Sequence, residues 1–161
     1  MHRLYLSIIS VLLAAVVYLA LKQGIGGHQS IAADQGARSI AVLQFVPLGE
    51  EPDTNALAGA LTEELIDALV VTEGIRVAAR TDSVAVKHVS PAAARALGVQ
   101  YLLEGSVGHE ADTIRVTAQL VDGETEAHLW SETYERSGAN VSEFSADIAR
   151  SVIDRLKSGE Q

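Results

Sequence analysis

The stretch from Tyr101 to Arg136 most constrains the fold, because it reads as three consecutive strands joined by two short polar turns. These strands are predicted at residues 101–108, 113–121 and 128–136. In the middle strand apolar and polar residues alternate, so one face is expected to be buried against helices and the other to meet solvent. The pattern therefore predicts an antiparallel meander with one covered face.

Two strands and a helix are predicted before the meander. Residues 39–45 form a nearly continuous apolar run, typical of a central strand buried on both faces, and residues 75–79 alternate as a short strand. Between them, side chains at 53–55 cap a predicted helix that ends at Gly74. Its apolar spacing predicts one buried face and leaves three polar residues toward solvent, namely Thr62, Glu63 and Asp67.

Two more helices complete the pattern. One runs from Pro91 to Leu97, and the other follows a capping box in which Asn140 and Glu143 satisfy each other's backbone amides. This last helix carries an apolar stripe, made of Phe144, Ile148, Val152 and Leu156. The order strand, helix, strand, helix, three strands, helix predicts an α/β fold, with a mixed β-sheet of about five strands packed by three helices.

An apolar run of 18 residues without a charge, Leu4 to Leu21, lies near the amino terminus. Its length is at the lower limit for a helix that spans about 30 Å of hydrocarbon. A cleaved signal peptide and an uncleaved anchor are the two interpretations. We favour the anchor, because Tyr18 stands where cleavage prefers a small residue and Lys22 follows at once. Residues 1–22 are thus predicted to be a signal-anchor transmembrane helix.

A tether and one folded domain are predicted after this helix. Residues 23–38 are rich in Gly, Gln and Ala without an apolar period, as in a flexible tether, and the α/β domain covers residues 39–158. Arg3 and the amino terminus precede the apolar run and only Lys22 directly follows it, a cation bias that predicts a cytoplasmic amino terminus. The domain would then lie in the periplasm.

The charge of the chain excludes one class of partner. All 21 acidic residues follow Lys22, against 10 of the 12 Lys and Arg residues, so residues 23–161 carry a net charge of about −11. Such a body repels phosphate backbones, and we expect no nucleic-acid binding. The chain has no cysteine, which excludes disulfides, thiolate metal sites and thiol catalysis.

Motifs for catalysis or for cofactor binding are not found. Gly105-Ser106-Val107-Gly108 lacks the spacing of a nucleophile elbow and sits in a predicted strand. The same glycines precede no helix that would hold a dinucleotide phosphate. No pair of histidines has the helical spacing that aims two imidazoles at one metal. We therefore predict no catalytic, cofactor or metal site.

The last predicted strand holds the candidate partner site. If this strand is regular, its residues His128, Trp130, Glu132 and Tyr134 share one face. The two rings either pack beneath a helix with their polar atoms hydrogen-bonded, or anchor a protein partner. We favour packing, and keep the four residues as the candidate partner-binding site.

Five short motifs, in this order and spacing, carry a family resemblance. They are LTEEL at 61–65, ART at 79–81, LEGSV at 103–107, RVTAQLVD at 115–122 and HLWSETYER at 128–136. With them, residues 39–156 resemble the TolB amino-terminal-domain-like family of bacterial envelope proteins, which includes FlgO-like proteins. Gln44 and Gly108 depart from the pattern, where relatives commonly have proline and arginine. The resemblance implies an anticodon-binding-domain-like fold, an assembly or scaffolding role, and no active site.

Together these features predict a non-catalytic protein-interaction domain of the envelope. It would be single-pass in the inner membrane through Leu4 to Leu21, with envelope proteins as partners and homo-oligomerisation left open; secretion after signal cleavage is the alternative location. The alternative function is a small-ligand-binding sensory or regulatory module, derived from a cyclase- or repeat-containing protein. A pocket lined by Arg76, Arg80 and Arg115 would favour that alternative.

Overall fold

A computed structural model describes residues 37–49, 52–79, 83, 86, 88–138 and 140–158. Among these residues, no helix combines the length and apolar character that a membrane crossing requires. The predicted transmembrane helix at 1–22 lies outside the described residues, as does the predicted tether at 23–38 except for its last two positions.

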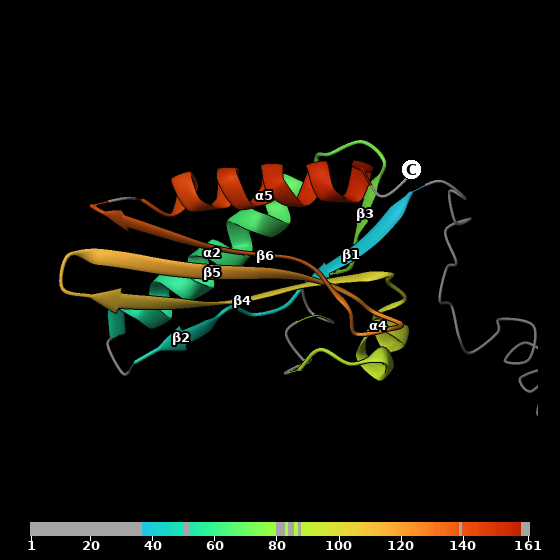
Figure 1. Cartoon of the computed structure of the whole chain (residues 1–161), viewed down its shortest axis with the longest axis horizontal. Helices are drawn as coiled ribbons and strands as arrows, with labels where there is room; N and C mark the ends of the chain where they lie inside the picture. The colour runs from blue at the N-terminus through green and yellow to red at the C-terminus, as the bar shows by residue number, and fades with distance from the viewer. Residues whose placement is uncertain are drawn as a thin grey trace, which may run out of the picture. The chain divides into compact units, whose positions relative to one another are not determined.

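The described domain is built on a six-stranded mixed sheet (Figure 1). Its strands are β1 (Arg38–Val42), β2 (Val46–Leu48), β3 (Ile75–Val77), β4 (Tyr101–Glu110), β5 (Thr113–Asp122) and β6 (His128–Ser137). The order across the sheet is β3, β1, β4, β5, β6, and β2 also pairs with β4. Strands β1 and β2 run parallel to β4, whereas β4, β5 and β6 form the predicted antiparallel meander.

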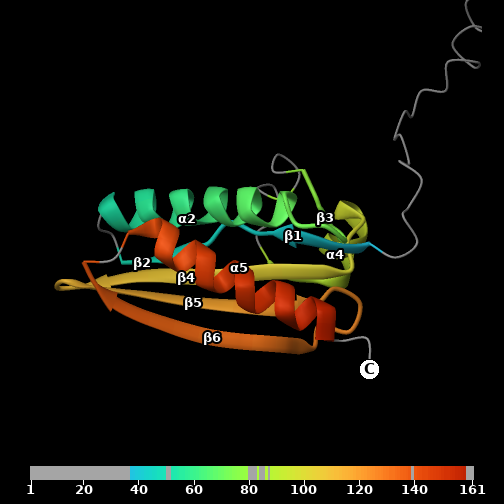
Figure 2. The same cartoon turned by 90° about the horizontal axis from the view of Figure 1, so that it is seen from above.

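Two long helices cover one face of this sheet. They are α2 (Pro52–Val70) and α5 (Val141–Ser158), which lie on the same side of the strands (Figure 2). The main core lies between these helices and the sheet, and includes Phe45, Leu65, Leu120 and Ile148. The predicted stripe of α5 is buried as expected, since Phe144, Ile148, Val152 and Leu156 are all at most 2% exposed.

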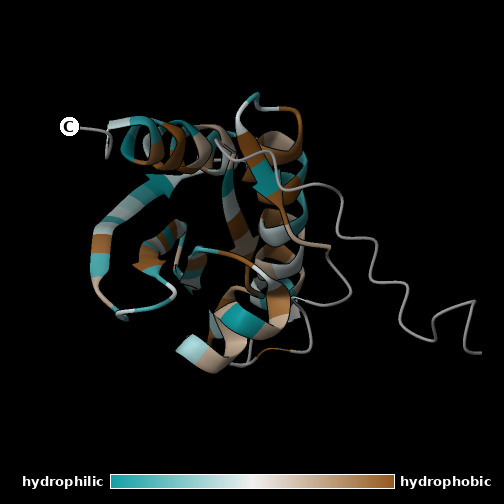
Figure 3. Cartoon of the chain, turned by 90° about the vertical axis from the view of Figure 1, so that its right-hand side faces the viewer, coloured by the Kyte–Doolittle hydropathy of each residue, from teal (hydrophilic) through white to brown (hydrophobic). Residues whose placement is uncertain are grey.

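The short helix α4 (Pro91–Leu97) covers one end of the opposite face (Figure 3). A second, smaller core forms there from Ala41, Leu43, Ala94, Val99 and Leu102. The helix has the predicted bounds, because the Ser90 side chain caps its start and Gly98, with φ of 63°, ends it in the left-handed region. The rest of this sheet face has no covering helix among the described residues.

The predicted mixed sheet with helices packed on it is confirmed, and one strand was missed. The sequence pattern predicts no strand between residue 45 and the caps at 53–55, but β2 occupies 46–48 and follows β1 along β4 after a break at 43–45. The predicted strand at 39–45 is therefore too long at its end. The proline and acids that follow indicate a loop, and three residues are too few for an alternation to be recognised.

The helix α2 starts and ends earlier than predicted. It begins at Pro52, which suits the first helical turn, and ends at Val70 rather than next to Gly74. Gly74 has φ of 79°, and its carbonyl accepts the backbone N–H of Arg38, so the glycine serves the turn into β3. At α5, Asn140 accepts the N–H of Glu143 as predicted, whereas the Glu143 carboxylate faces Arg136.

The prediction that Thr62 faces solvent was wrong. Thr62 is 3% exposed, and its hydroxyl accepts the N–H of Phe45 while it donates to the carbonyl of Ala58. A helical pattern read from apolar residues misses a polar residue that is buried to satisfy the backbone of another segment. Its neighbour Glu64 is also engaged, because its carboxylate accepts hydrogen bonds from Ser142 and Ser145 of α5.

Candidate functional site

The four candidate partner-binding residues do not all share one face of β6. Trp130 lies opposite Leu120 of the main core and Tyr134 lies opposite Val116, so Trp130, Glu132 and Tyr134 face α5. A bulge between Leu120 and Val121 then shifts the register, and His128 pairs with Val121 instead. The strand is therefore not regular, and His128 lies on the opposite face from the other three.

The two rings of this strand pack against the domain's own helix. Trp130 and Tyr134 are partly buried against the main core. The Tyr134 hydroxyl donates to the Glu132 carboxylate at 3.0 Å and lies 3.3 Å from the Ser151 hydroxyl of α5. Burial raises the pKa of Tyr134, and the Glu132 carboxylate acts in the same direction. Tyr134 thus has the packing that the sequence favoured, with its hydroxyl hydrogen-bonded, and both rings are only partly buried.

A cluster of charges links the end of β6 to α5. Arg136 forms an ion pair with Asp147 and lies 5.4 Å from the centre of the Phe144 ring, with Glu143 at 4.0 Å. The hydrogen bond from Arg136 lowers the pKa of the Asp147 carboxyl, and the same bond raises the pKa of Arg136. Sequence reasoning missed this cluster. Its signal was an arginine at the end of the strand and acids in the first turns of the next helix.

The outer edge of β6 is the longest free backbone edge in the described part of the chain. β6 has ten residues and pairs with β5 on one side only, at the end of the strand order. The other edge strands, β3 and β2, have three residues each. Strand β6 contains no proline and no lysine, but it carries a bulge near His128 and the charged residues Glu132, Glu135 and Arg136, which disfavour pairing with an arbitrary strand. A second strand can pair with β6 through its backbone where its side chains match these charges.

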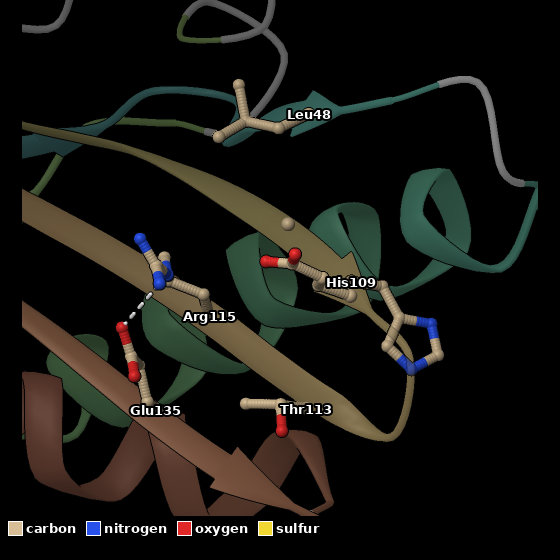
Figure 4. A pocket seen from close by; sticks show the side chains of 7 residues that line it. Leu48, His109, Thr113, Arg115 and Glu135 are labelled. Atoms are coloured by element: carbon tan, nitrogen blue, oxygen red, sulfur yellow. Dashed lines mark ion pairs between the residues drawn. The ribbon is translucent and has the colours of Figure 1, made fainter.

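A shallow hollow of about 550 Å³ lies at the far end of the uncovered sheet face (Figure 4). Leu48, Gly108, Thr113, Arg115 and Glu135 are among its lining residues. Arg115 and Glu135 form an ion pair at 2.9 Å, and both side chains are more than half exposed. Exposed ion pairs of this kind contribute little stability, and the hollow is a solvent-exposed polar surface rather than a site that excludes water.

The arginine pocket that would favour a small ligand is not assembled. Arg115 lies on β5 opposite Gly108, and Arg76 lies on β3 level with the start of β4. They are separated by β1 and β4, which is about 14 Å across the strands at the usual spacing, and further by several residues along the strands. Arg76 donates to the carbonyl of Gly98 instead. Arg80 lies outside the described residues.

The structure gives the Gly-Ser-Val-Gly segment of β4 a packing role. A Cβ atom at Gly105 would lie 2.3 Å from both the Phe45 ring and the carbonyl oxygen of Thr117, so only glycine fits there. Ser106 lies opposite Thr117 on the uncovered face. Within the described ranges, no group of three or more His, Asp or Glu side chains is placed to hold a metal ion.

Comparison with known proteins shows which solved structures have a similar fold. No family model matches the chain. The described domain superposes on TolB of Acinetobacter baumannii with a TM-score of 0.58 and 14% identity, over 76% of this chain and 29% of that chain. It also superposes on a Xanthomonas campestris protein with a TM-score of 0.52 and 11% identity, over 78% and 89% of the two chains. The TolB-like fold predicted from the motifs is thereby confirmed.

One curated relative is more similar in sequence. Over 122 residues the chain is 38% identical to a Rhizobium meliloti (strain 1021) protein named "Putative adenylate cyclase 3". The match takes in 74% of this chain, but the chain spans only 21% of the length of that relative. The similarity therefore concerns a domain of the larger protein.

Proposed function

We propose that this chain is a non-catalytic protein-interaction domain of the bacterial envelope, related to the TolB amino-terminal-domain-like and FlgO-like proteins. Residues 1–22 anchor it in the inner membrane, residues 23–38 are the tether, and residues 39–158 form the domain in the periplasm. The partner is another protein of the envelope. The observation that carries the proposal is the ten-residue edge strand β6, which has one open side and presents Trp130, Glu132 and Tyr134 next to it.

The roles of the motif residues support a non-catalytic function. Leu61 and Leu65 pack in the core. The Thr62 hydroxyl accepts a backbone N–H at the break between β1 and β2, and the Glu64 carboxylate accepts a hydrogen bond from α5. In the last motif Arg136 joins β6 to α5. These folding roles account for the named residues of the first and last motifs without a reaction. Such a domain would act by binding other proteins through its surface.

In vivo crosslinking followed by affinity capture from solubilised membranes tests the proposal. Glu132→Ala and Trp130→Ala are expected to weaken capture of a partner, the latter by more than about 1 kcal/mol, or roughly fivefold. Circular dichroism must show that both variants stay folded, because Trp130 also packs on the core. Glu132 is exposed, so its replacement separates binding from folding. Unchanged capture by both folded variants would remove β6 as the partner site.

Anchoring needs a measurement of its own. The intact mass of protein extracted from membranes is expected to include residues 1–22. A mature form that begins after residue 20 would contradict the anchor and leave secretion after signal cleavage.

A second candidate function is a sensory or regulatory module of a cyclase-containing protein, and the similarity to the Rhizobium meliloti protein favours it. In that case the domain would change the activity of an enzyme to which it is joined, or with which it associates, on binding a small ligand. Thermal unfolding of the purified chain with and without cyclic and acyclic adenine nucleotides gives a first test, since a ligand of the folded state raises the melting temperature. No shift with any of them would remove these nucleotides as ligands.

A further inference from the structure

We propose that β6 pairs with β6 of a second copy, in antiparallel orientation, around a two-fold axis at Tyr134. This inference rests on the proposed protein-binding function and names the partner. The two sheets would join into one continuous sheet, with both α5 helices on the same face. A symmetric contact of this kind uses the same strand twice, so its side chains must be complementary to themselves.

The side chains of β6 meet this condition. Glu132 and Arg136 lie on the α5 face of the strand, with Tyr134 midway between them. A two-fold axis at Tyr134 places Glu132 opposite Arg136 of the second copy, and the symmetry repeats this opposite-charge pair. Directly opposed residues of antiparallel strands have adjacent side chains, and opposite charges there are favourable.

On the uncovered face the same register brings Glu135 opposite Thr133 and Ser131 opposite Ser137. These residues are exposed in the described domain. No like charges are opposed at any of these positions. A carboxylate facing a hydroxyl and a hydroxyl facing a hydroxyl are pairs that form hydrogen bonds.

The three registers with an axis at Glu132, Thr133 or Glu135 are less favourable. An axis at Glu132 or at Glu135 opposes two identical carboxylates at the centre of the contact, which is destabilising. An axis at Thr133 avoids that repulsion but forms no ion pair, because Glu132 then faces Tyr134 and Arg136 faces Trp130. The net acidic body opposes contact between copies through arbitrary surfaces, so matched charges decide where two copies meet.

Disulfide crosslinking tests the register residue by residue, because the natural chain has no cysteine. Two tagged versions of the full chain, one with Thr133→Cys and one with Glu135→Cys, are mixed in solubilised membranes and oxidised. Opposed residues have Cα atoms about 4.5–5.5 Å apart, within the range that a disulfide spans. Thr133 and its own copy would be offset by two residues, or about 7 Å along the strand, which is too far.

The expected result is a mixed disulfide several times more abundant than either homodisulfide. Adding Glu132→Arg to both versions opposes two arginines and is expected to reduce the mixed product several-fold. Glu73→Arg, the same charge change at an exposed position just before β3 on the opposite edge of the sheet, is the matched control and is expected to leave the product unchanged. Ser106→Cys, on the interior strand β4, gives the level of random collision.

Three results would overturn the inference. A dominant Thr133→Cys homodisulfide would place the axis at Thr133. A mixed product no greater than the Ser106→Cys level would exclude pairing through β6. Capture of a different envelope protein at β6, without the mixed disulfide, would also exclude self-pairing while it supports the proposed protein-binding function. A mixed product that is lost with Glu132→Arg but retained with the control charge change would support the inference.

Discussion

The hydroxyl of Thr62 on α2 accepts the backbone N–H of Phe45 at 3.1 Å, at the break between β1 and β2. Both groups are buried, so the N–H that leaves the sheet at this point has no access to water. The same hydroxyl donates to Ala58, which satisfies its own proton. One side chain thus allows the strand to break and restart beneath the helix.

Thr62→Val is therefore expected to destabilise the domain by about 1–3 kcal/mol, because the buried N–H of Phe45 loses its acceptor. Chemical denaturation measures the change. Thr54→Val is the matched control: Thr54 is a buried threonine of the same helix whose hydroxyl has no hydrogen-bond partner among the described residues. Its replacement should be neutral or stabilising. Equal losses in both variants would show that the Phe45 bond contributes nothing specific.

Gly105→Ala is expected to destabilise by about 1–3 kcal/mol, because the added methyl group overlaps the Phe45 ring and the carbonyl of Thr117. Gly108→Ala, three positions along β4, is expected to be tolerated, since its nearest contact is an ordinary 3.7 Å from Leu48. Thermal unfolding of the pair distinguishes them. A tolerated Gly105→Ala would mean that Phe45 can move away from β4.

Ala111→Gly is expected to stabilise the domain by up to about 1 kcal/mol. Ala111 has φ of 52° in the turn between β4 and β5, a conformation that costs a residue with a Cβ atom but not glycine. At the next position, Asp112, φ is not positive. Asp112→Gly is therefore expected to destabilise the domain, because glycine increases the conformational entropy of the unfolded chain. Opposite signs in the two melting-temperature shifts are the expected outcome.

Asp147→Asn is expected to remove a part of the acid sensitivity of the fold. Arg136 lowers the pKa of Asp147 below its ordinary value of 3.8, so the folded state holds this carboxylate ionised. The stability it contributes is present above that value and is lost as the pH falls through the lower, folded-state pKa. The variant should therefore be less stable at neutral pH, and its difference from the natural chain should shrink on acidification. Asp154→Asn, on the same helix but outside the Arg136 cluster, is the control. A constant difference at all pH values would contradict this account.

The elements of this fold follow from local patterns, whereas its exceptions follow from contacts between segments. Alternation along β5 and the stripe of α5 were read from spacing alone, because each reports one buried face. Proline and glycine at the ends of α4 fixed its bounds. By contrast, β2 and the burial of Thr62 depend on each other across the break, and no local pattern records that dependence.

In the candidate site, too, some features follow from the local sequence and others depend on contacts between segments. Trp130 and Tyr134 were recognised because two rings in an aromatic-poor chain occupy one strand. The bulge that moves His128 to the other face arises from the pairing of β5 with β6, which shifts by one residue past Leu120. Likewise, the Arg136–Asp147 pair joins two elements whose crossing geometry the sequence does not specify.

The parallel pairing of β1 has a consequence for how the chain reaches its native state. Both of its partners, β3 and β4, come later in the chain, and Ile40 pairs with Val77 on one side and with Tyr101 on the other. A chain that emerges amino terminus first during synthesis therefore leaves this apolar strand without a partner until β3 has followed it, and open on one side until β4 has followed. The meander and α5 join close neighbours in sequence and form sooner. Residues 38–42 are thus the segment that most needs protection from aggregation before folding is complete.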